Sequence, residues 1–183
     1  MNAKSNDWLR RFQDSTWLYS LSLVVVYLLW KVLHHYLRLP SFPLYAPWKT
    51  LVQVVGTWYA AAATPLLCML GEQVTHVGIT FQFHPSLRSV LVEEHCLAFP
   101  GMFIFTWAIL LYKGAWKNKL WFIPLGLLGI VCINIIRLVF LGLTFEHFGA
   151  LFFSINHSLI YVVVTYSLIF LMIYWWMEKL AQR

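Results

Sequence analysis

Residues 120–143 read LWFIPLGLLGIVCINIIRLVFLGL, an apolar run with a single charged side chain, Arg137. About 20 predominantly apolar residues suffice for a helix to cross the hydrocarbon core of a bilayer, so this run predicts a transmembrane helix. An arginine near mid-membrane costs about 2.5–3.5 kcal/mol on insertion scales and usually faces the protein interior. We therefore favour a functional role for Arg137 over the alternative that its side chain snorkels to the outer headgroups.

The composition of the whole chain indicates the same class of protein. Of the 183 residues, 61% are hydrophobic and 11% are charged, whereas soluble domains carry about a quarter charged residues. The ten tryptophans and nine tyrosines suit the two lipid–water interfaces, where amphipathic rings collect. The formal net charge of +6 is spread over short loops, so we interpret it as a topology signal and expect no nucleic-acid partner.

We expect an all-α polytopic integral membrane protein with about five transmembrane helices, folded as a single membrane domain over residues 1–183. The predicted spans cover residues 17–33, 51–70, 97–112, 120–143 and 157–176, after an interfacial segment over residues 1–16. Within the second span, Gly56, Ala60 and Thr64 recur every four residues. Small residues at that spacing predict a face that packs closely against another element.

Residues 74–92 have a different periodicity. Apolar and polar residues alternate from Val77 to His84, which is the period-two pattern of a β-strand. Pro85 and Ser86 interrupt the pattern, and residues 89–92 can form a return strand. We expect a small extracytoplasmic β-hairpin near residues 74–92 that lies on the membrane surface and leads directly into Cys96.

Short basic loops set the orientation of a membrane protein. The loop Lys113–Lys119 carries three lysines and no acidic residue, so we expect it in the cytoplasm, together with the loop between the first two spans, and the hairpin outside. Five spans then place the N-terminal segment outside, although it holds Lys4, Arg10 and Arg11. Either this segment violates the positive-inside rule or the first apolar run does not cross fully.

Three polar groups should converge near the outer leaflet. They are Glu93-Glu94-His95-Cys96 at the start of the third span, Asn134 and Arg137 in the fourth, and Asn156-His157 at the start of the fifth. The distance from Trp121 to Arg137 is about 24 Å of helix and the hydrocarbon core is about 30 Å thick. Arg137 should therefore lie roughly one turn below the outer surface, with Asn134 on the same helix face.

A thiol, a guanidinium and an imidazole at one membrane surface indicate a cysteine-dependent active site. A lone cysteine is more often a small buried hydrophobe, but a helix N-terminus and Arg137 would favour the thiolate of Cys96. Glu93 and Glu94 would disfavour that thiolate. The rival base His95 is adjacent to Cys96 in sequence and should point elsewhere. The spacing of residues 93–96 matches no zinc-ligand pattern, so we expect no metal and no cofactor.

At these residues the sequence resembles the exosortase/archaeosortase family of integral-membrane cysteine transpeptidases. The resemblance covers roughly residues 74–176 and rests on ordered features: Cys96 at the outer start of a span after a strand-like segment, Asn134-x-x-Arg137 in the next span, and His157 opening the last. The family often has a small residue and a glycine immediately after the cysteine, whereas Leu97-Ala98 follows here. This departure leaves two alternatives open, a divergent bacterial branch or an altered substrate preference, and the small size of the chain suggests a minimal branch.

The resemblance implies a mechanism and a set of partners. Cys96 would attack a peptide carbonyl and form a thioester acyl-enzyme, His157 would act as general acid and then base, and Arg137 would stabilise the oxyanion. Asn134 and Asn156 would bind or orient the substrate or Arg137. The implied substrates are exported proteins with a C-terminal sorting signal made of a short motif, a transmembrane helix and a basic tail. The enzyme would lie among the lipids of the cell inner membrane, with its active site at the extracytoplasmic face.

Two other functions stay open at this point. In a non-catalytic scaffold or assembly subunit, Arg137 would be a structural ion-pair partner of Glu146 or Glu94, and Arg137→Lys would be tolerated. A small transporter or haem-binding protein would use histidines of this chain, and haem would give a visible absorption band. The histidines considered for that role are His34, His35, His147 and His157.

Overall fold

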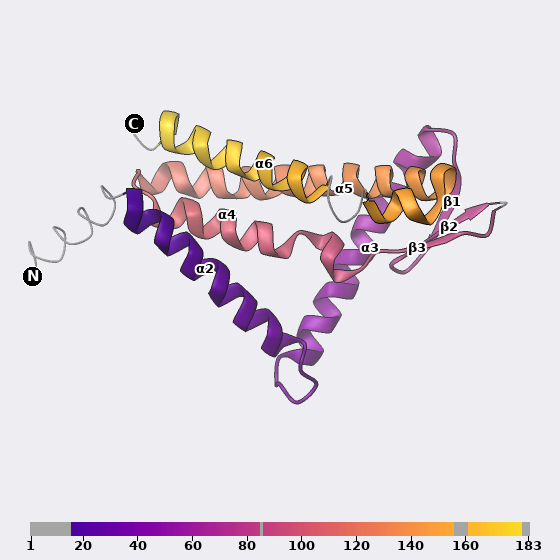
Figure 1. Cartoon of the computed structure of the whole chain (residues 1–183), viewed down its shortest axis with the longest axis horizontal. Coiled ribbons are helices and arrows are strands. Elements are labelled where there is room, and N and C mark those ends of the chain that lie inside the picture. Colours follow the sequence, from indigo (N-terminus) through magenta and orange to yellow (C-terminus); the bar gives the residue numbers. More distant parts are fainter. Residues whose placement is uncertain (1–15, 85, 156–160, 181–183) are drawn as a thin grey trace, which may run out of the picture.

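The computed structural model of the chain describes residues 16–84, 86–155 and 161–180. The described residues form long helices and one small sheet (Figure 1). The helices are α2 (Thr16–Leu37), α3 (Tyr45–Met69), α4 (Phe99–Leu111), α5 (Trp116–Ile155) and α6 (Tyr161–Trp175), with a 3₁₀ turn η1 (Glu94–Leu97) and a π-helical end η3 (Trp176–Leu180). The strands are β1 (Gln73–Val77), β2 (Thr80–His84) and β3 (Ser89–Leu91).

The predicted helical membrane architecture is confirmed. By length and apolar composition, four described segments can cross a membrane: Trp17–Leu37, Tyr45–Met69, Glu94–Leu111 and Trp116–Phe148. The fifth predicted span begins at residue 157, outside the described residues, and its described part is α6.

The predicted hairpin is confirmed as β2 with its return strand β3. Strand β1, which the sequence did not predict separately, pairs with the other edge of β2 after a turn at residues 78–79 and completes a three-stranded antiparallel sheet in the order β1-β2-β3. Gly78 takes a positive φ of 59° in the turn between β1 and β2, a conformation that glycine adopts without steric cost. Strand β2 alternates as the sequence predicts, since Phe81 and Phe83 are buried while Gln82 is exposed.

Helices α2 and α4 run antiparallel. At one end the Tyr19 hydroxyl donates to the carbonyl of Ala108 at 3.1 Å, and the rings of Tyr19 and Tyr112 lie 5.0 Å apart. At the other end the rings of Trp30 and Phe103 lie 5.1 Å apart. The start of α2 therefore meets the end of α4.

Helix α5 is antiparallel to both α4 and α6. Near its start, Phe122 packs against Phe105 of α4 with 5.8 Å between ring centroids and against Trp176, just past the end of α6, with 5.0 Å. The starts of α2 and α5 thus share one end of the molecule with the ends of α4 and α6 (Figure 1). We call this the loop end, because residues 112–115 join α4 to α5 there, and we call the opposite end of α4 the cysteine end.

Helix α3 departs from this bundle. It turns sharply away from the direction of α2 and crosses α5 (Figure 1). The predicted small-residue face is buried at Gly56 and Ala60 and half-buried at Thr64. A Cβ atom added at Gly56 would lie 2.9 Å from the side chain of Ile79, so this face packs against the sheet as well as against α5.

Candidate active site

The structure brings Cys96 and Asn134 together. Cys96 lies in η1, where its backbone N–H donates to the carbonyl of Glu93 at 2.8 Å. The side-chain amide of Asn134 donates to the backbone carbonyl of Cys96. Asn134 is fully buried, and the large majority of buried side-chain polar groups have hydrogen-bond partners of this kind. This hydrogen bond ties α5 to the turn that carries the thiol.

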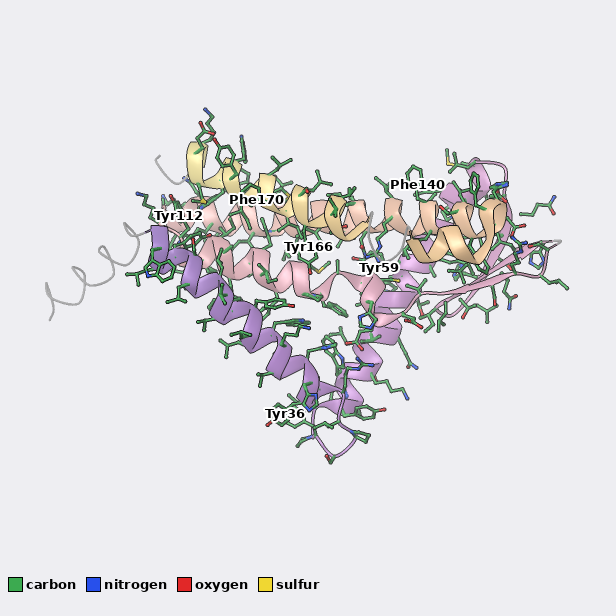
Figure 2. The ribbon with its side chains drawn as sticks, viewed as in Figure 1. Tyr36, Tyr59, Tyr112, Phe140, Tyr166 and Phe170 are labelled. Atoms are coloured by element: carbon green, nitrogen blue, oxygen red, sulfur yellow. The ribbon has the colours of Figure 1, made fainter. Side chains whose placement is uncertain are left out.

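Arg137 lies one helical turn beyond Asn134 and is also buried, with 7% of its surface exposed. It interacts electrostatically with Cys96 and with Tyr166 of α6. Tyr59 of α3 is buried against Asn134. Figure 2 shows Tyr59 where α3 meets α5 and Tyr166 between α6 and α4. The arginine therefore faces the protein interior, as the sequence favoured, and is surrounded by side chains from several helices.

A cavity of about 460 Å³ lies beside Arg137. Its wall combines residues from Tyr27 to His34 of α2, Glu94 and His95 of η1, the first turn of α4, and Thr165 and Tyr166 of α6. Cys96 is not among the described residues that line this cavity, and only 4% of its surface is exposed. The thiol is therefore covered in this conformation, although His95, directly before it, and Ala98, two residues after it, reach the cavity.

A second polar cluster, which sequence reasoning did not assemble, lies in the same wall. The Nε2 atom of His34 is 2.5 Å from Oε1 of Glu94, and the Trp48 indole donates to the same oxygen at 3.0 Å. The ring of Trp30 stacks on His34 at 5.7 Å. The sequence did place His34 among polar residues near the end of an apolar run, but no local spacing relates it to Glu94, which lies 60 residues away.

The predicted residues Asn156 and His157 lie outside the described residues. The acidic residues considered as partners of Arg137 have other contacts. Glu94 binds His34 and Trp48, as described above, and Glu146 accepts a hydrogen bond from Ser86 at 2.9 Å. Among the described residues, no three His, Cys, Asp or Glu side chains gather in a group that could hold a metal ion.

Fold and site together define a polytopic membrane protein with a cysteine, an arginine and an asparagine converging at one end of a helical bundle. The sequence model of the transmembrane exosortase family matches residues 6–175. The chain therefore belongs to the transmembrane exosortase family, and the resemblance noted over residues 74–176 is confirmed and extends to the first helices. No curated protein and no solved structure matches the chain.

Proposed function

We propose that the chain is a membrane-embedded cysteine protease/transpeptidase that cleaves the C-terminal sorting signal of exported proteins and transfers them to an acceptor. The observation that carries the proposal is the hydrogen bond from Asn134 to the Cys96 carbonyl, together with the positive charge of Arg137, which acts on the same cysteine. Family membership supports the reaction class. Inner-membrane localisation with the site at the extracytoplasmic face is part of this proposal.

In the first half-reaction, His157 takes the proton of the Cys96 thiol. The sulfur then attacks the carbonyl carbon of the scissile peptide bond. Arg137 stabilises the negative charge that develops on the carbonyl oxygen, since a fixed cation in a low-dielectric site is effective there. The C–N bond breaks, His157 returns its proton to the leaving amine, and a thioester remains on Cys96.

In the second half-reaction, the acceptor nucleophile loses its proton to His157 and attacks the thioester carbon. The C–S bond breaks, the product leaves, and the Cys96 thiolate is regenerated. Asn134 acts here as a positioning residue, because it holds the carbonyl of the nucleophile's own turn. Asn156, next to His157 in sequence, would help orient the substrate.

The covered thiol requires one conformational step. A substrate in the cavity would contact His95, directly before Cys96, and Ala98, two residues after it, but not the thiol itself in the conformation described. We propose that docking of the sorting signal shifts η1 and opens Cys96 to the cavity. The short 3₁₀ turn suits this motion, since its hydrogen-bond geometry is poorer than that of an α-helix.

The test is intact-mass analysis of a co-expressed exported protein that bears a short motif, a transmembrane helix and a basic tail. With the wild-type chain, its mass should fall by the mass of the signal, and any added mass identifies the acceptor. Cys96→Ala should abolish processing, whereas the matched variants Cys68→Ala and Cys132→Ala should retain it. Processing by Cys96→Ala would exclude Cys96 as the nucleophile.

A non-catalytic scaffold remains the second candidate, and the burial of Cys96 is the observation that favours it. In that case the cysteine is a packing residue of the core formed with Leu97 and Leu138. The same experiment separates the two functions, because a scaffold leaves every candidate signal uncleaved in both wild type and Cys96→Ala. The Cys96→Ala variant should then also show altered stability as its only phenotype.

A further inference from the structure

We propose that the segment from residue 38 to residue 95 stays on one side of the membrane, and that α3 lies along the lipid surface there instead of crossing. The segment leaves α2 at the cysteine end and enters α4 at the same end. This placement replaces the expectation of a span over residues 51–70, and it holds whether or not Cys96 is catalytic.

Both ends of the segment are fixed by contacts at the cysteine end. His34, in the last turn of α2, binds Glu94 at 2.5 Å, just before α4 begins. The first turn of α3 is at the same place, since Trp48 also donates to Glu94 and its ring lies 5.0 Å from that of Phe99. Helix α3 therefore starts level with the start of α4.

From that point α3 runs away from the loop end. Tyr59 lies against Asn134 of α5, and two turns later Leu67 lies against Gly142, where an added Cβ would be 3.4 Å from a Leu67 methyl. Gly142 is farther from the start of α5 than Asn134 is. A crossing helix would instead have to approach Phe122 and the loop end.

The return path is also too short for a crossing. The backbone N–H of Val92 donates to the carbonyl of Ile79 in the sheet at 2.8 Å, and η1 begins two residues later at Glu94. Three extended residues reach at most about 10 Å, against about 30 Å of hydrocarbon. An open three-stranded sheet inside lipid would also leave unpaired backbone groups at its edges.

The charge distribution agrees with this topology. With α3 on the surface, four helices cross the membrane: α2, α4, α5 and α6. The start of α2 and the end of α6 then both lie at the loop end, on the same side of the membrane. Lys4, Arg10 and Arg11 precede α2 in the sequence, and the loop Lys113–Lys119 leads from α4 to α5 at the loop end, where α2 begins. Both basic segments are then cytoplasmic, which removes the conflict with the positive-inside rule.

Helix α3 has the surface of an interfacial helix. One face is buried against α5 and the sheet, through residues such as Ala60 and Leu67. In the turns before the packed part, the same side carries the exposed polar residues Lys49 and Gln53, seven residues before Gly56 and Ala60. The opposite face is apolar and exposed, with Leu51 at 46%, Val54 at 44%, Trp58 at 71% and Met69 at 83%.

Outer-leaflet lipid is the occupant that this exposed apolar face fits. A helix with separate polar and apolar faces lies in the interface plane with its apolar side buried in the acyl boundary. Trp58 suits that depth, since tryptophan collects at the membrane–water interface. The sharp turn between α2 and α3 (Figure 1) allows α2 to cross while α3 lies flat.

The topology is tested by labelling single cysteines in intact cells with a membrane-impermeant maleimide. In a background of Cys68→Ser, Cys96→Ala and Cys132→Ser, both Ser41→Cys and Ser86→Cys should be labelled without permeabilisation, and Lys117→Cys only after it. Protection of Ser41→Cys in intact cells would overturn the proposal, because a crossing α3 places residue 41 in the cytoplasm. If the cysteine-free background fails to accumulate, a fluorescent protein fused before residue 1 of the native sequence should fluoresce as a cytoplasmic domain, and a dark fusion would overturn the proposal.

The lipid contact is tested by nitroxide labels in vesicles of phosphatidylethanolamine and phosphatidylglycerol. The same background carries either Trp58→Cys on the apolar face or the matched control Gln53→Cys on the polar face. The label at 58 should collide with oxygen and be shielded from a water-soluble nickel relaxant, and the label at 53 should show the reverse. Nickel access at both positions would overturn lipid docking, and shielding from both relaxants at position 58 would assign that face to a protein partner instead.

Discussion

The two ends of the α4–α5–α6 bundle are built differently. At the loop end, Phe105, Phe122 and Trp176 form a contiguous aromatic core with almost no exposed surface. At the cysteine end, the same helices meet through Asn134 and Arg137, beside a cavity of about 460 Å³. Apolar packing dominates the first end, where the buried Lys119 ammonium donates to the carbonyls of Leu110 and Tyr112. The second end retains space beside its buried polar groups.

Helix α5 therefore contributes to stability mainly through its residues at the loop end and to the candidate site mainly through its residues at the cysteine end. A cavity forgoes the dispersion contacts that a filled core makes, and buried polar side chains add desolvation costs that their partners only partly offset. A molecule selected for packing alone would fill the cysteine end as it fills the loop end. Substitutions at the cysteine end should therefore affect activity first, and those at the loop end should affect stability first.

The largest effect is expected for Arg137→Lys. Lysine keeps the positive charge but loses the planar fork of donors that can bind an oxyanion, and removing one oxyanion donor typically lowers kcat by about 10²–10³-fold. The measurement is the rate of signal cleavage by mass spectrometry in cells. Ile136→Val, at an exposed neighbouring position of α5, is the control and should leave the rate unchanged. Full activity of Arg137→Lys would support a structural role for the arginine.

Glu94→Ala should be the largest stability change at the cysteine end. It removes the partner of both His34 and Trp48, and hydrogen bonds to charged groups contribute about 1.5–3 kcal/mol each when partly buried. The thermal midpoint of the purified protein should fall. Glu93→Ala, one residue away and exposed, should leave the midpoint unchanged. Equal midpoints for the two variants would show that the His34–Glu94 contact does not tie α2 to η1.

Gly126→Ala tests the packing of the loop end. An added Cβ would lie 2.1 Å from the ring of Phe105, so the ring has to move, and overpacking a filled core costs about 1–3 kcal/mol. At Gly129, in the same helix, the nearest atom would be at an ordinary 3.7 Å, so Gly129→Ala is the matched control. The thermal midpoint of Gly126→Ala should be lower than that of Gly129→Ala. The cleavage rate per amount of folded protein should be similar for the two variants. A stable Gly126→Ala would contradict tight packing at this end.

Much of this architecture could be predicted from the sequence, because the decisive signals are local. Apolar runs longer than a bilayer core predict spans, and the alternation from Val77 to His84 predicts strands. Arg137 and Asn134 could be placed on one helix face from their spacing. Each of these inferences uses residues that are neighbours along one element.

What the sequence could not supply are relations between distant elements. The pair of His34 and Glu94 depends on how α2 packs against η1, and no periodicity encodes that. The direction of α3 is a second example, since its composition is that of a span while its contacts with Asn134 and Gly142 carry it away from the loop end. The burial of Cys96 is a third, because the wet start of a helix can still be covered by neighbouring elements.

Ala98→Gly should produce the smallest change in stability, and it tests whether the turn that carries Cys96 moves at the cysteine end. Ala98 has φ 55° and ψ 21° and forms the N-cap of α4, where its carbonyl accepts from the N–H of Met102 at 3.0 Å. The left-handed region costs an L-residue about 1–2 kcal/mol, and the greater freedom of glycine in the unfolded chain offsets about 0.5–1 kcal/mol of the relief. Stability should therefore rise by at most about 1.5 kcal/mol.

The matched variant is Ala98→Val, which puts a β-branched residue at the same positive φ and should destabilise the protein. Thermal unfolding measures both changes, and the cleavage rate measures their consequence for the turn that carries Cys96. If η1 must shift to open the thiol, glycine next to it should change the rate by more than its small effect on stability accounts for. A rate that tracks stability alone in both variants would mean that the thiol becomes accessible without movement of this turn.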